Sequence, residues 1–400
     1  MAYFPRPLTA VALANCLGNT SAEVFARARS GETRFSASDE VYPDLPFRVP
    51  VGAMKGLAKR SANFPWSGLE TRFFQIVFAS VLQIETPVAK AVARWGKDRV
   101  SYVFSSSTGG LAHTEDSVEK GMRPDEFGDV LRDHSMHATN EDVMNYLGIA
   151  GYCYVVTTAC SSSLKALKVG IRLIESGLAD AVLVGCADTL CRTTLYGFRS
   201  LGILPDTPTS PFSAERAGLT LGEGSAYVLL ERSADSPLAW VTGMGESSDA
   251  FHPSSPDPTG NGARASMQEA LTTAGLAPRD IDHVAAHATG TMQNDAMESL
   301  AIDTLFHGTP VTATKSLTGH TLGAAGLTSL AFSLYSLEHQ LCLPTLRSEP
   351  RDTGIPLSIV TRTTERALRH VMVNSFAFGG SNCSAILSRS HPPTREGGSS

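Results

Sequence analysis

Short apolar runs of strand character alternate with segments of helical spacing along most of this chain, and this alternation constrains the fold more than any other feature. The sequence predicts strands at residues 100–104 and 181–185 in the first half, and at residues 283–287 and 371–374 in the second. Such alternation is typical of α/β proteins with central sheets. Both halves combine strands, a glycine-bearing loop and a buried helix in similar order, which indicates a duplicated architecture without a residue-level repeat.

The composition is that of an ordinary globular chain, and it argues against several classes of function. The 400 residues are 42% hydrophobic and 18% charged, enough for two core-forming domains or one large one. The net charge of −6 argues against a nucleic-acid partner. No basic segment followed by a long apolar run opens the chain, and the longest apolar stretches, such as residues 330–337, are broken by serines. We therefore expect neither a secretory signal nor membrane insertion.

The cysteines argue against a cross-linked or metal-bound fold. The seven cysteines show no CxxC pair and no regular spacing. A disulfide framework, a zinc site or another metal site is therefore not expected. A reducing cytoplasm is the compartment that fits this usage.

One of the seven, Cys160, lies at a special position in the chain. A strand-like run at residues 154–156 precedes it, and a helical pattern at residues 161–167 follows. A thiol at the first turn of a helix meets free backbone N–H groups and the positive end of the helix macrodipole. Both favour the thiolate, which is the nucleophilic form of cysteine.

Two histidines lie in equally unusual settings. His287 begins the run His-Ala-Thr-Gly-Thr, and His320 lies within Lys-Ser-Leu-Thr-Gly-His-Thr-Leu-Gly-Ala-Ala-Gly. Taken alone, each of the three residues has a structural alternative: a buried small hydrophobe for Cys160, a core histidine for His287 and a turn residue for His320. Together, a nucleophilic cysteine and two histidines are the groups needed for acyl transfer through a thioester.

Five short motifs carry a resemblance to a known family. They are Thr158-Ala159-Cys160, residues 247–252, residues 287–291, residues 315–320 with 323–326, and residues 374–382. Because these motifs occur in this order and at these spacings, the chain resembles the β-ketoacyl-acyl-carrier-protein synthases of the elongating Cys-His-His type, in the thiolase-like superfamily. The resemblance implies an α/β thiolase-like fold, in which two pseudo-symmetric βαβαβ-type halves form five layers, α-β-α-β-α. It also implies a homodimer joined along a strand edge.

The resemblance suggests how the chain is divided. Residues 1–235 are expected to form an N-terminal thiolase-like half that carries the nucleophilic cysteine. Residues 236–388 are expected to form a C-terminal half that carries both histidines and Lys315. Residues 389–400 are polar and are predicted to be a disordered tail.

The family's reaction is a decarboxylative Claisen condensation. An acyl group moves from a carrier-protein thioester to the cysteine, malonyl-carrier protein loses carbon dioxide, and the resulting carbanion attacks the acyl-cysteine. The resemblance assigns the nucleophile to Cys160 and the oxyanion hole to the backbone N–H groups of Cys160 and Phe378. His287 and His320 would donate N–H hydrogen bonds as neutral imidazoles, and Lys315 would orient the histidine pair.

The same resemblance implies roles for residues around these groups. Thr289 and Thr291 match positions that hydrogen-bond the phosphopantetheine arm. Phe376 and Phe378 match a substrate-binding loop. Glu298 matches an acidic position of the polar network around the active-site lysine.

Three positions depart from the family pattern. Thr108 aligns with a bulky aliphatic gate of the acyl channel, Ala377 with a hinge glycine, and Ser329 with a glutamate of the lysine's network. Without that glutamate, Glu298 is the expected partner of Lys315, and the case for a structural monovalent cation near Glu298 weakens. Together the departures favour a specialised acyl substrate, as in polyene or polyketide synthesis, and housekeeping fatty-acid synthesis stays open as the alternative.

The resemblance implies an acyl carrier protein as the partner. The carrier brings the phosphopantetheine arm, so no dissociable cofactor is expected. Because carrier proteins are acidic, positive side chains near the pocket would dock them. The candidates form two sequence-local clusters, Lys55 with Lys59 and Arg60, and Arg192 with Arg199. A solvated basic face is the alternative interpretation.

Three other functions stay open. A priming acyltransferase or thiolase-type enzyme would skip decarboxylation, although thiolases usually use a second cysteine. A chain-length factor would only shape a partner's pocket, although such subunits usually lack the nucleophile. A homodimer is expected, but this protein could also be one subunit of a heterodimer of ketosynthase and chain-length factor.

Overall fold

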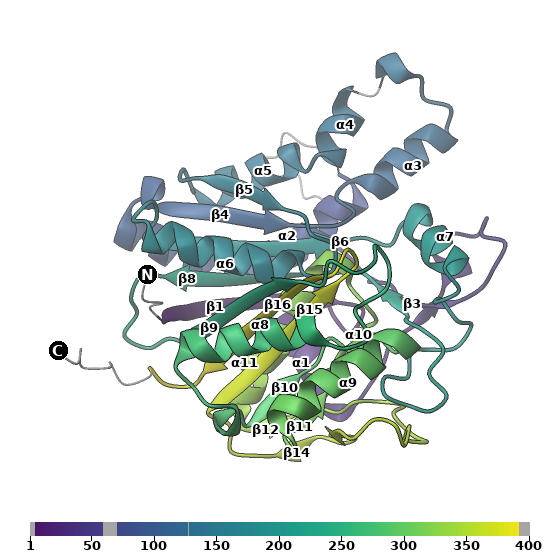
Figure 1. Cartoon of the computed structure of the whole chain (residues 1–400). Helices are drawn as coiled ribbons and strands as arrows, with labels where there is room; N and C mark the ends of the chain where they lie inside the picture. The colour runs from purple at the N-terminus through teal and green to yellow at the C-terminus, as the bar shows by residue number, and fades with distance from the viewer. Residues whose placement is uncertain (1–4, 59–69, 127, 392–400) are drawn as a thin grey trace.

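The structure is a computed structural model that describes residues 5–58, 70–126 and 128–391 (Figure 1). Two predicted docking residues, Lys59 and Arg60, and residues 392–400 of the predicted tail lie outside the described residues. The α-helices are α1 (Ser21–Ser30), α2 (Arg72–Trp95), α3 (Leu111–Glu119), α4 (Gly128–His134), α5 (His137–Leu147), α6 (Ser162–Glu175), α7 (Arg192–Ser200), α8 (Asn261–Ala274), α9 (Met292–Phe306), α10 (Lys315–Thr318) and α11 (Ala325–His339). The strands are β1 (Arg6–Asn15), β2 (Ser36–Ala37), β3 (Pro50–Gly52), β4 (Val100–Ser105), β5 (Cys153–Val156), β6 (Ala181–Asp188), β7 (Leu221–Gly222), β8 (Gly224–Glu231), β9 (Ala239–Ser248), β10 (His283–Ala285), β11 (Pro310–Thr312), β12 (Leu341–Cys342), β13 (Ser358–Ile359), β14 (Thr364–Glu365), β15 (His370–Ala377) and β16 (Ser381–Ser388).

A large mixed sheet shows the duplication directly. Its strand order is β13-β11-β10-β15-β16-β9-β1-β8-β6-β4-β5. If β1, β4, β5, β6 and β8 are numbered 1 to 5, and β9, β10, β11, β15 and β16 likewise, both halves have the order 3-2-4-5-1. In both halves strand 2 is parallel to strands 3 and 4, whereas strands 4, 5 and 1 pair antiparallel. The predicted α/β fold with two pseudo-symmetric halves is confirmed.

The two half-sheets meet at one short joint. Arg6, Pro7 and Leu8 of β1 pair antiparallel with Val241, Trp240 and Ala239 of β9. Main-chain hydrogen bonds thus run through both halves, and the nucleophile and the two histidines belong to one continuous framework.

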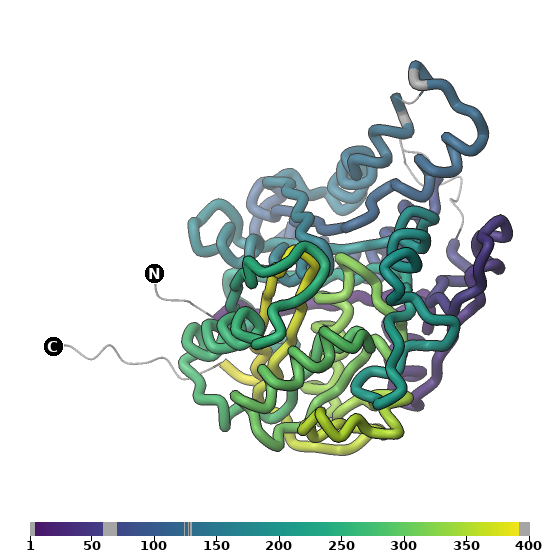
Figure 2. Tube along the Cα trace, turned by 45° about the vertical axis from the view of Figure 1, so that its right-hand side comes forward, coloured from purple at the N-terminus to yellow at the C-terminus, as the bar shows by residue number. Residues whose placement is uncertain are grey.

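Helices cover the sheet in layers, as the predicted five-layer arrangement requires (Figures 1 and 2). Helices α6 and α11 contact each other and form the middle layer, where their apolar faces join side chains of β1, β6, β8 and β15 in one core. Helix α2 packs on the other face of the first half-sheet. Helices α8 and α9 cover the second half-sheet in the same way. The middle layer therefore lies between the two half-sheets, and the loops that lead into α6 and α11 face each other.

Helix α2 is the largest element that the sequence did not reveal. It is the one described helix that is long and apolar enough to cross a membrane by length and composition, with mean hydropathy 1.4 over its best window. The expectation that no apolar stretch reaches that length is therefore wrong. Its buried side chains, among them Phe73, Ile76 and Ile84, pack against β1, β4, β6 and β8. That packing on the sheet is the physical reason for its apolar composition.

Element boundaries place the chemistry in loops rather than inside the regular elements. Strand β10 ends at Ala285. The sequence predicted that this strand would extend to His287, but His287 lies in the loop that follows. Helix α6 begins at Ser162, and Cys160 therefore precedes its first turn. Ala159 has φ 52°, a left-handed conformation that interrupts the strand-to-helix path and delays the helix start.

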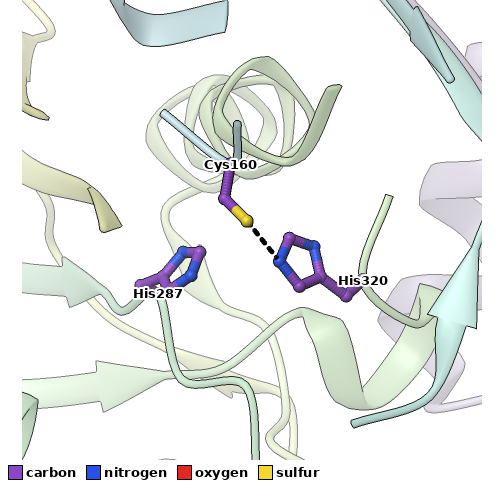
Figure 3. Close-up of side chains that lie close together, drawn as sticks. All are labelled: Cys160, His287 and His320. Carbon is purple, nitrogen blue, oxygen red and sulfur yellow. Dashed lines mark hydrogen bonds between the residues drawn. The ribbon is translucent and has the colours of Figure 1, made fainter. Parts of the chain in front are cut away.

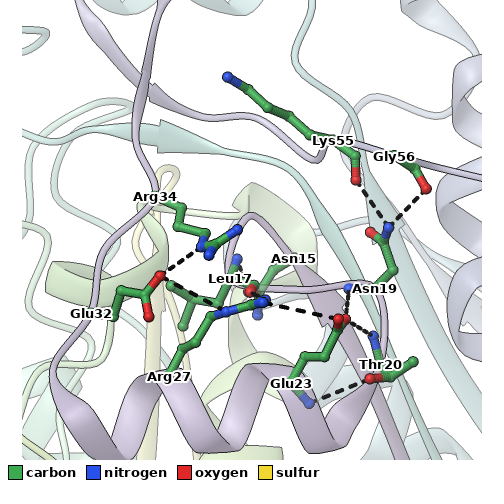
Figure 4. Close-up of polar contacts among 10 residues, drawn as sticks. All are labelled: Asn15, Leu17, Asn19, Thr20, Glu23, Arg27, Glu32, Arg34, Lys55 and Gly56. Carbon is green, nitrogen blue, oxygen red and sulfur yellow. Dashed lines mark hydrogen bonds and ion pairs between the residues drawn. The ribbon is translucent and has the colours of Figure 1, made fainter.

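Helix α1 shows how a local sequence fixes an element and a hollow beside it (Figure 4). The Thr20 side chain and Glu23 form a reciprocal capping box at its N-terminus. Arg27 lies 3.9 Å from Glu32, and Arg34 lies 2.7 Å from the same carboxylate. A hollow of about 330 Å³ opens there, and its wall includes Arg27, Arg34 and Asn15. Because the carboxylates of Glu23 and Glu32 lie within 4.0 Å of these arginines, this hollow carries little free positive charge.

A glycine in the central strand β6 gives a stability test. A Cβ atom built at Gly185 would lie 2.1 Å from Cε1 of the fully buried Tyr227, whereas one at Gly197 on α7 meets nothing within 4 Å. We expect Gly185→Ala to lower the free energy of unfolding by about 1–3 kcal/mol or more through overpacking. Gly197→Ala should leave it unchanged or raise it by up to about 1 kcal/mol. Urea unfolding of both variants beside the wild type measures this, and equal midpoints would contradict the packing described for β6.

Candidate active site

The nucleophile lies on a strained connection between β5 and α6. Ala159 holds a left-handed conformation directly before Cys160, and Ser161 is the N-cap of α6. The Ser375 hydroxyl donates a 2.7 Å hydrogen bond to the Cys160 carbonyl, which ties this turn to β15 of the other half. Cys160 is only 8% exposed. The thiol is therefore held at the interface of the two halves, shielded from bulk solvent.

Both predicted histidines lie beside this thiol (Figure 3). Nε2 of His320 lies 3.1 Å from Sγ of Cys160, and the rings of His287 and His320 are 5.4 Å apart with an interplanar angle of 85°. His287 follows β10, and His320 follows the short helix α10. Each of the three is less than 9% exposed. The structure thus brings together three residues that the sequence separates by as many as 160 positions.

Fixed donors set the tautomer of both imidazoles. The backbone N–H of Leu322 donates to Nδ1 of His320 at 3.1 Å, and the Lys315 ammonium lies 3.1 Å from Nδ1 of His287. Burial and the Lys315 charge hold the pKa of both rings well below the usual value for histidine. A neutral imidazole that accepts at Nδ1 carries its proton at Nε2. Both rings therefore carry their proton on Nε2, and Nε2 of His320 faces Sγ of Cys160.

The same three side chains could also be considered as metal ligands. Their ligand atoms all lie within 4.8 Å of one another. A metal-bound imidazole nitrogen must carry no proton, but the hydrogen bonds from Leu322 and Lys315 to Nδ1 place the protons on Nε2. The donor set fits hydrogen bonding to an oxyanion better than it fits a metal.

Lys315 and Glu298 fix the His287 loop from behind. The Lys315 ammonium also donates to the His287 carbonyl oxygen, while Glu298 accepts from the backbone N–H groups of His287 and Ala288 at 2.7 and 2.6 Å. Burial lowers the pKa of Lys315, and the charge of Glu298 opposes this shift. Among the described residues, no carboxylate lies within 4.0 Å of the Lys315 ammonium. Glu298 therefore acts on Lys315 at a distance, and its oxygens are occupied by backbone donors, not by the direct pairing expected from the sequence.

Ser329 lies in the place where a second acid was expected. Its hydroxyl lies 3.4 Å from that of Thr314, the residue before Lys315, and it is 2% exposed. This pair of hydroxyl groups is neutral, so it compensates the charge of Lys315 less than a carboxylate at the same position would. The field of the lysine thus acts more fully on its neighbours.

The electrostatics of the thiol reflect two opposing effects. Burial is the largest effect and raises the pKa of Cys160 to about 11. The charge of Lys315 and the backbone N–H groups of Phe378 and Cys160 act in the opposite direction and lower this pKa. These two N–H groups are the predicted oxyanion-hole donors, and both act at the sulfur. Phe378 itself is 37% exposed and stacks on Phe198 with ring centroids 5.7 Å apart. Its backbone thus faces the thiol while its ring borders the entrance.

A narrow cavity of about 70 Å³ leads to the thiol. Thr289 and Thr291 line it, with their hydroxyl oxygens 2.9 Å apart, next to Phe376 and Phe378. Its remaining wall consists of these residues: Cys160, Ile203, Leu219, Phe198, Asp249, Ser254, Ser255, Pro256, His287, Gln293, Asn294, His320, Ala377 and Asn382. Polar threonines line the side of the cavity and aromatic rings lie at its mouth, an arrangement suited to a long arm with amide groups and a thioester end.

Thr108 does not line this cavity. It is 5% exposed, and its hydroxyl donates to Asp188 at 2.9 Å while accepting from the backbone N–H of Thr189. The sequence analysis missed Asp188, a fully buried carboxylate at the end of β6. Its position at the end of a central strand, before a polar loop, was the available signal.

The predicted docking cations are paired within the chain. Arg192 lies 2.9–3.0 Å from three carboxylates, those of Asp44, Asp116 and Glu119. Arg199 pairs with Asp206 at 2.8 Å, and Lys55 pairs with Glu40 at 3.0 Å. Arg192, Arg199 and Lys55 therefore offer less free positive charge to an acidic partner than the sequence clusters suggested.

The charge of Lys315 gives a test at the thiol. Because the thiolate is the reactive form, alkylation of Cys160 should rise about tenfold per pH unit below the thiol pKa. Lys315→Gln removes a charge that lowers that pKa, so we expect its alkylation rate at pH 8 to fall by about tenfold for each unit of pKa increase. Lys168→Gln, which breaks a pair with Glu246, is the matched control. Iodoacetamide labelling mapped to Cys160 by mass spectrometry measures the rates, and identical rates for both variants would contradict this electrostatic role.

Two family descriptions match the chain on either side of one boundary. The description "Beta-ketoacyl synthase, N-terminal domain" matches residues 93–236, and "Beta-ketoacyl synthase, C-terminal domain" matches residues 238–349. Together they cover well over half of the chain, and they contain Cys160, both histidines and Lys315.

Curated proteins of similar sequence agree with this assignment. A 3-oxoacyl-[acyl-carrier-protein] synthase 2 of Rhizobium meliloti is 35% identical over 260 residues, which span 60% of this chain and 62% of that protein. A protein with the same description from Vibrio cholerae is 30% identical over 342 residues, 79% of this chain and 82% of the relative. The matched region thus spans less than two thirds of the first relative and more than four fifths of the second.

Solved structures extend the similarity to nearly the full chain. A ketosynthase in complex with its chain length factor, from Xenorhabdus doucetiae, has a TM-score of 0.88 and 33% identity over 97% of this chain and 98% of that one. The ishigamide ketosynthase/chain length factor has a TM-score of 0.85 and 25% identity over 97% of this chain and 100% of that one. Fold, motif order and site geometry lead to one conclusion: this chain belongs to the β-ketoacyl synthase family.

Proposed function

We propose that this protein is a condensing acyltransferase that extends an acyl chain on an acyl carrier protein by a malonyl-derived two-carbon unit. One observation carries the proposal: Sγ of Cys160 lies 3.1 Å from Nε2 of His320 and within 4.8 Å of a ring nitrogen of His287, and both histidines are buried and neutral. A nucleophile alone would serve many acyl transfers. Two further N–H donors at the same point are what a developing enolate oxygen needs.

In the first step Cys160 acquires the acyl group. The thiolate attacks the carrier thioester carbonyl, and the oxyanion of the tetrahedral intermediate lies against the N–H groups of Cys160 and Phe378. The carbon–sulfur bond to the carrier breaks, and the carrier thiolate leaves and takes up the proton that the Cys160 thiol lost. The N–H groups that lower the pKa of Cys160 support this placement of the oxyanion hole.

In the second step malonyl-carrier protein loses carbon dioxide. The electron pair of the breaking carbon–carbon bond moves onto the thioester, and the enolate oxygen accepts hydrogen bonds from Nε2–H of His287 and His320. The enolate carbon then attacks the acyl-Cys160 carbonyl, and the thiolate leaves as the carbon–carbon bond forms. Neutral donors suit this step, because a charged imidazolium would protonate the enolate.

The partner, the arm and the division of the chain follow from the same proposal. The phosphopantetheine arm enters through the cavity lined by Thr289 and Thr291, with Phe378 at its mouth and the buried Phe376 beside His287. The arm comes with the carrier, so the enzyme needs no dissociable cofactor, and the cytoplasm is its location. Residues 1–235 and 236–388 form the two halves, a division that the repeated strand order supports.

A second candidate is the catalytic subunit of a heterodimer with a chain-length factor. Strand β5 ends the sheet. Tyr154 and Val155 within it are 43% and 42% exposed, and Tyr152 just before it is 46% exposed. An apolar edge strand of this kind invites pairing with another chain. The Xenorhabdus doucetiae ketosynthase, 33% identical to this chain, is found in complex with its chain length factor.

Intact-protein mass spectrometry tests the reaction. The wild type, incubated with a panel of acyl-carrier proteins, should gain one acyl mass, and Cys160→Ala should gain none. Addition of malonyl-carrier protein should then discharge the acyl group as a β-ketoacyl product. His287→Ala and His320→Ala should lose the second step by about 10²–10³-fold each, since each removes one preorganised donor. Acylation followed by no condensation in the wild type would refute the elongating activity and favour a priming transferase.

The edge strand gives a test of assembly. Val155→Glu places a charge on the exposed edge, and we expect it to convert a dimer into a monomer. Leu300→Glu changes an exposed side chain, 49%, on α9 of the other half and should leave the dimer intact. Sedimentation velocity of the protein alone and co-expressed with a related chain lacking the cysteine measures both. Dimerisation of Val155→Glu at wild-type affinity would contradict an interface at β5.

A further inference from the structure

Asp188 is a buried carboxylate that the mechanism above leaves without a role. It ends strand β6 and is fully buried. One of its oxygens, Oδ1, accepts from the Ser106 hydroxyl at 2.9 Å and from the backbone N–H groups of Ser107 and Thr108 at 2.7 Å each. The Thr108 hydroxyl donates to the same oxygen at 2.9 Å. This half of the carboxylate therefore holds the loop that follows β4.

The other oxygen holds a second loop. Oδ2 of Asp188 accepts from the backbone N–H of Ala324 at 2.9 Å. Ala324 belongs to the 3-10 turn Leu322–Ala324, which connects His320 to α11. A Cβ atom built at Gly323 would lie 2.7 Å from the Ser107 hydroxyl and 2.9 Å from Oδ2 of Asp188. The two loops thus touch, and the carboxylate joins them.

The turn that Asp188 holds also fixes His320. The backbone N–H of Leu322, two residues before Ala324, donates to Nδ1 of His320. Leu322 has φ 51°, a left-handed conformation that a non-glycine residue keeps only when its surroundings enforce it. If the turn relaxed, Nδ1 would lose its donor and could take the ring proton. Nε2 would then face Cys160 as an acceptor and could no longer donate to an oxyanion.

We propose that Asp188 is a positioning residue for condensation, which holds the Leu322–Ala324 turn so that His320 keeps its proton on Nε2. The inference rests on the proposed function and adds to it the reason why His320 carries its proton on Nε2. The carboxylate also holds Thr108 beside that turn, so the loop after β4 and the His320 loop keep one spacing. Asp188 touches neither substrate nor reacting atoms. Its charge also raises the pKa of Cys160, so decarboxylation and the His320 tautomer, and not acylation of the thiol, report its positioning role.

Asp188→Asn gives a selective test. The amide oxygen can take the place of Oδ1 and accept the same hydrogen bonds. The amide nitrogen then takes the place of Oδ2 and faces the N–H of Ala324, so two hydrogen-bond donors oppose each other. We expect kcat for decarboxylation of malonyl-carrier protein to fall about 10–100-fold, less than the loss from removing a donor outright. The KM should change by no more than about twofold, because the entry cavity does not contain Asp188.

A second readout reports the tautomer itself. In protein with ¹⁵N-labelled histidine, the resonances of His320, assigned with His320→Gln, should show a protonated Nε2 in the wild type and a mixed or reversed tautomer in Asp188→Asn. Asp180→Asn is the control: this acid, 8% exposed, lies just before β6 and pairs with Arg99 and Arg232, far along the strand from the site. Its tautomer and kcat should match the wild type.

The outcomes separate the inference from the proposed function. A wild-type tautomer and kcat in Asp188→Asn would overturn the positioning role, whatever the wild type catalyses. A wild type that fails to condense would refute the proposed function, while the tautomer comparison would still decide the role of Asp188. If Asp188→Asn does not fold, Gly323→Ala carries the test, because its Cβ would press the turn away from the same carboxylate oxygen. An unchanged His320 tautomer in that variant would also overturn the proposal.

Discussion

The chemistry of this site depends on two nitrogen atoms that accept hydrogen bonds. Nδ1 of His320 accepts from a backbone N–H, and Nδ1 of His287 accepts from the Lys315 ammonium. Each acceptance moves the ring proton to the far nitrogen, which faces the thiol. Burial and the lysine charge keep both rings neutral, so the protons at Nε2 are donors that are not easily released. The donors of these hydrogen bonds belong to well-packed parts of the chain. They therefore fix the tautomer of each ring, which an isolated histidine side chain does not do.

The duplicated sheet explains how residues so far apart in the sequence meet. The same strand order in each half places the loops before α6 and α11 against each other across the middle layer. The first of these loops carries Cys160, and the second follows His320. The Ser375 hydroxyl then binds the Cys160 carbonyl across the boundary. A site at such a boundary needs both halves, and the continuous pairing of β1 with β9 keeps their relative position fixed.

The sequence was most informative where the chemistry depends on residue type and local order. It indicated the α/β fold, the duplication and the group of Cys160, His287, His320 and Lys315. It missed helix α2, although Thr71 at its N-cap and Gly96 after its last residue were available as start and stop signals. It also missed Asp188 and the pairing of Arg192, because these depend on contacts between residues far apart in the sequence. Side-chain pairing over such distances is set by tertiary packing, which local patterns do not encode.

The neutral hydroxyl pair of Ser329 and Thr314 has a consequence for the charge of the site. A second carboxylate near Lys315 would raise the pKa of the lysine and also screen its field at Cys160 and the histidines. Glu298 and Asp295 act on the lysine without direct contact, and both oxygens of Glu298 are bound to backbone N–H groups, so more of the lysine's field acts on its neighbours. That field lowers the pKa of Cys160 and of both rings, in the directions that favour a thiolate and neutral imidazoles. A serine rather than an acid at position 329 therefore favours the two protonation states that the proposed condensation requires.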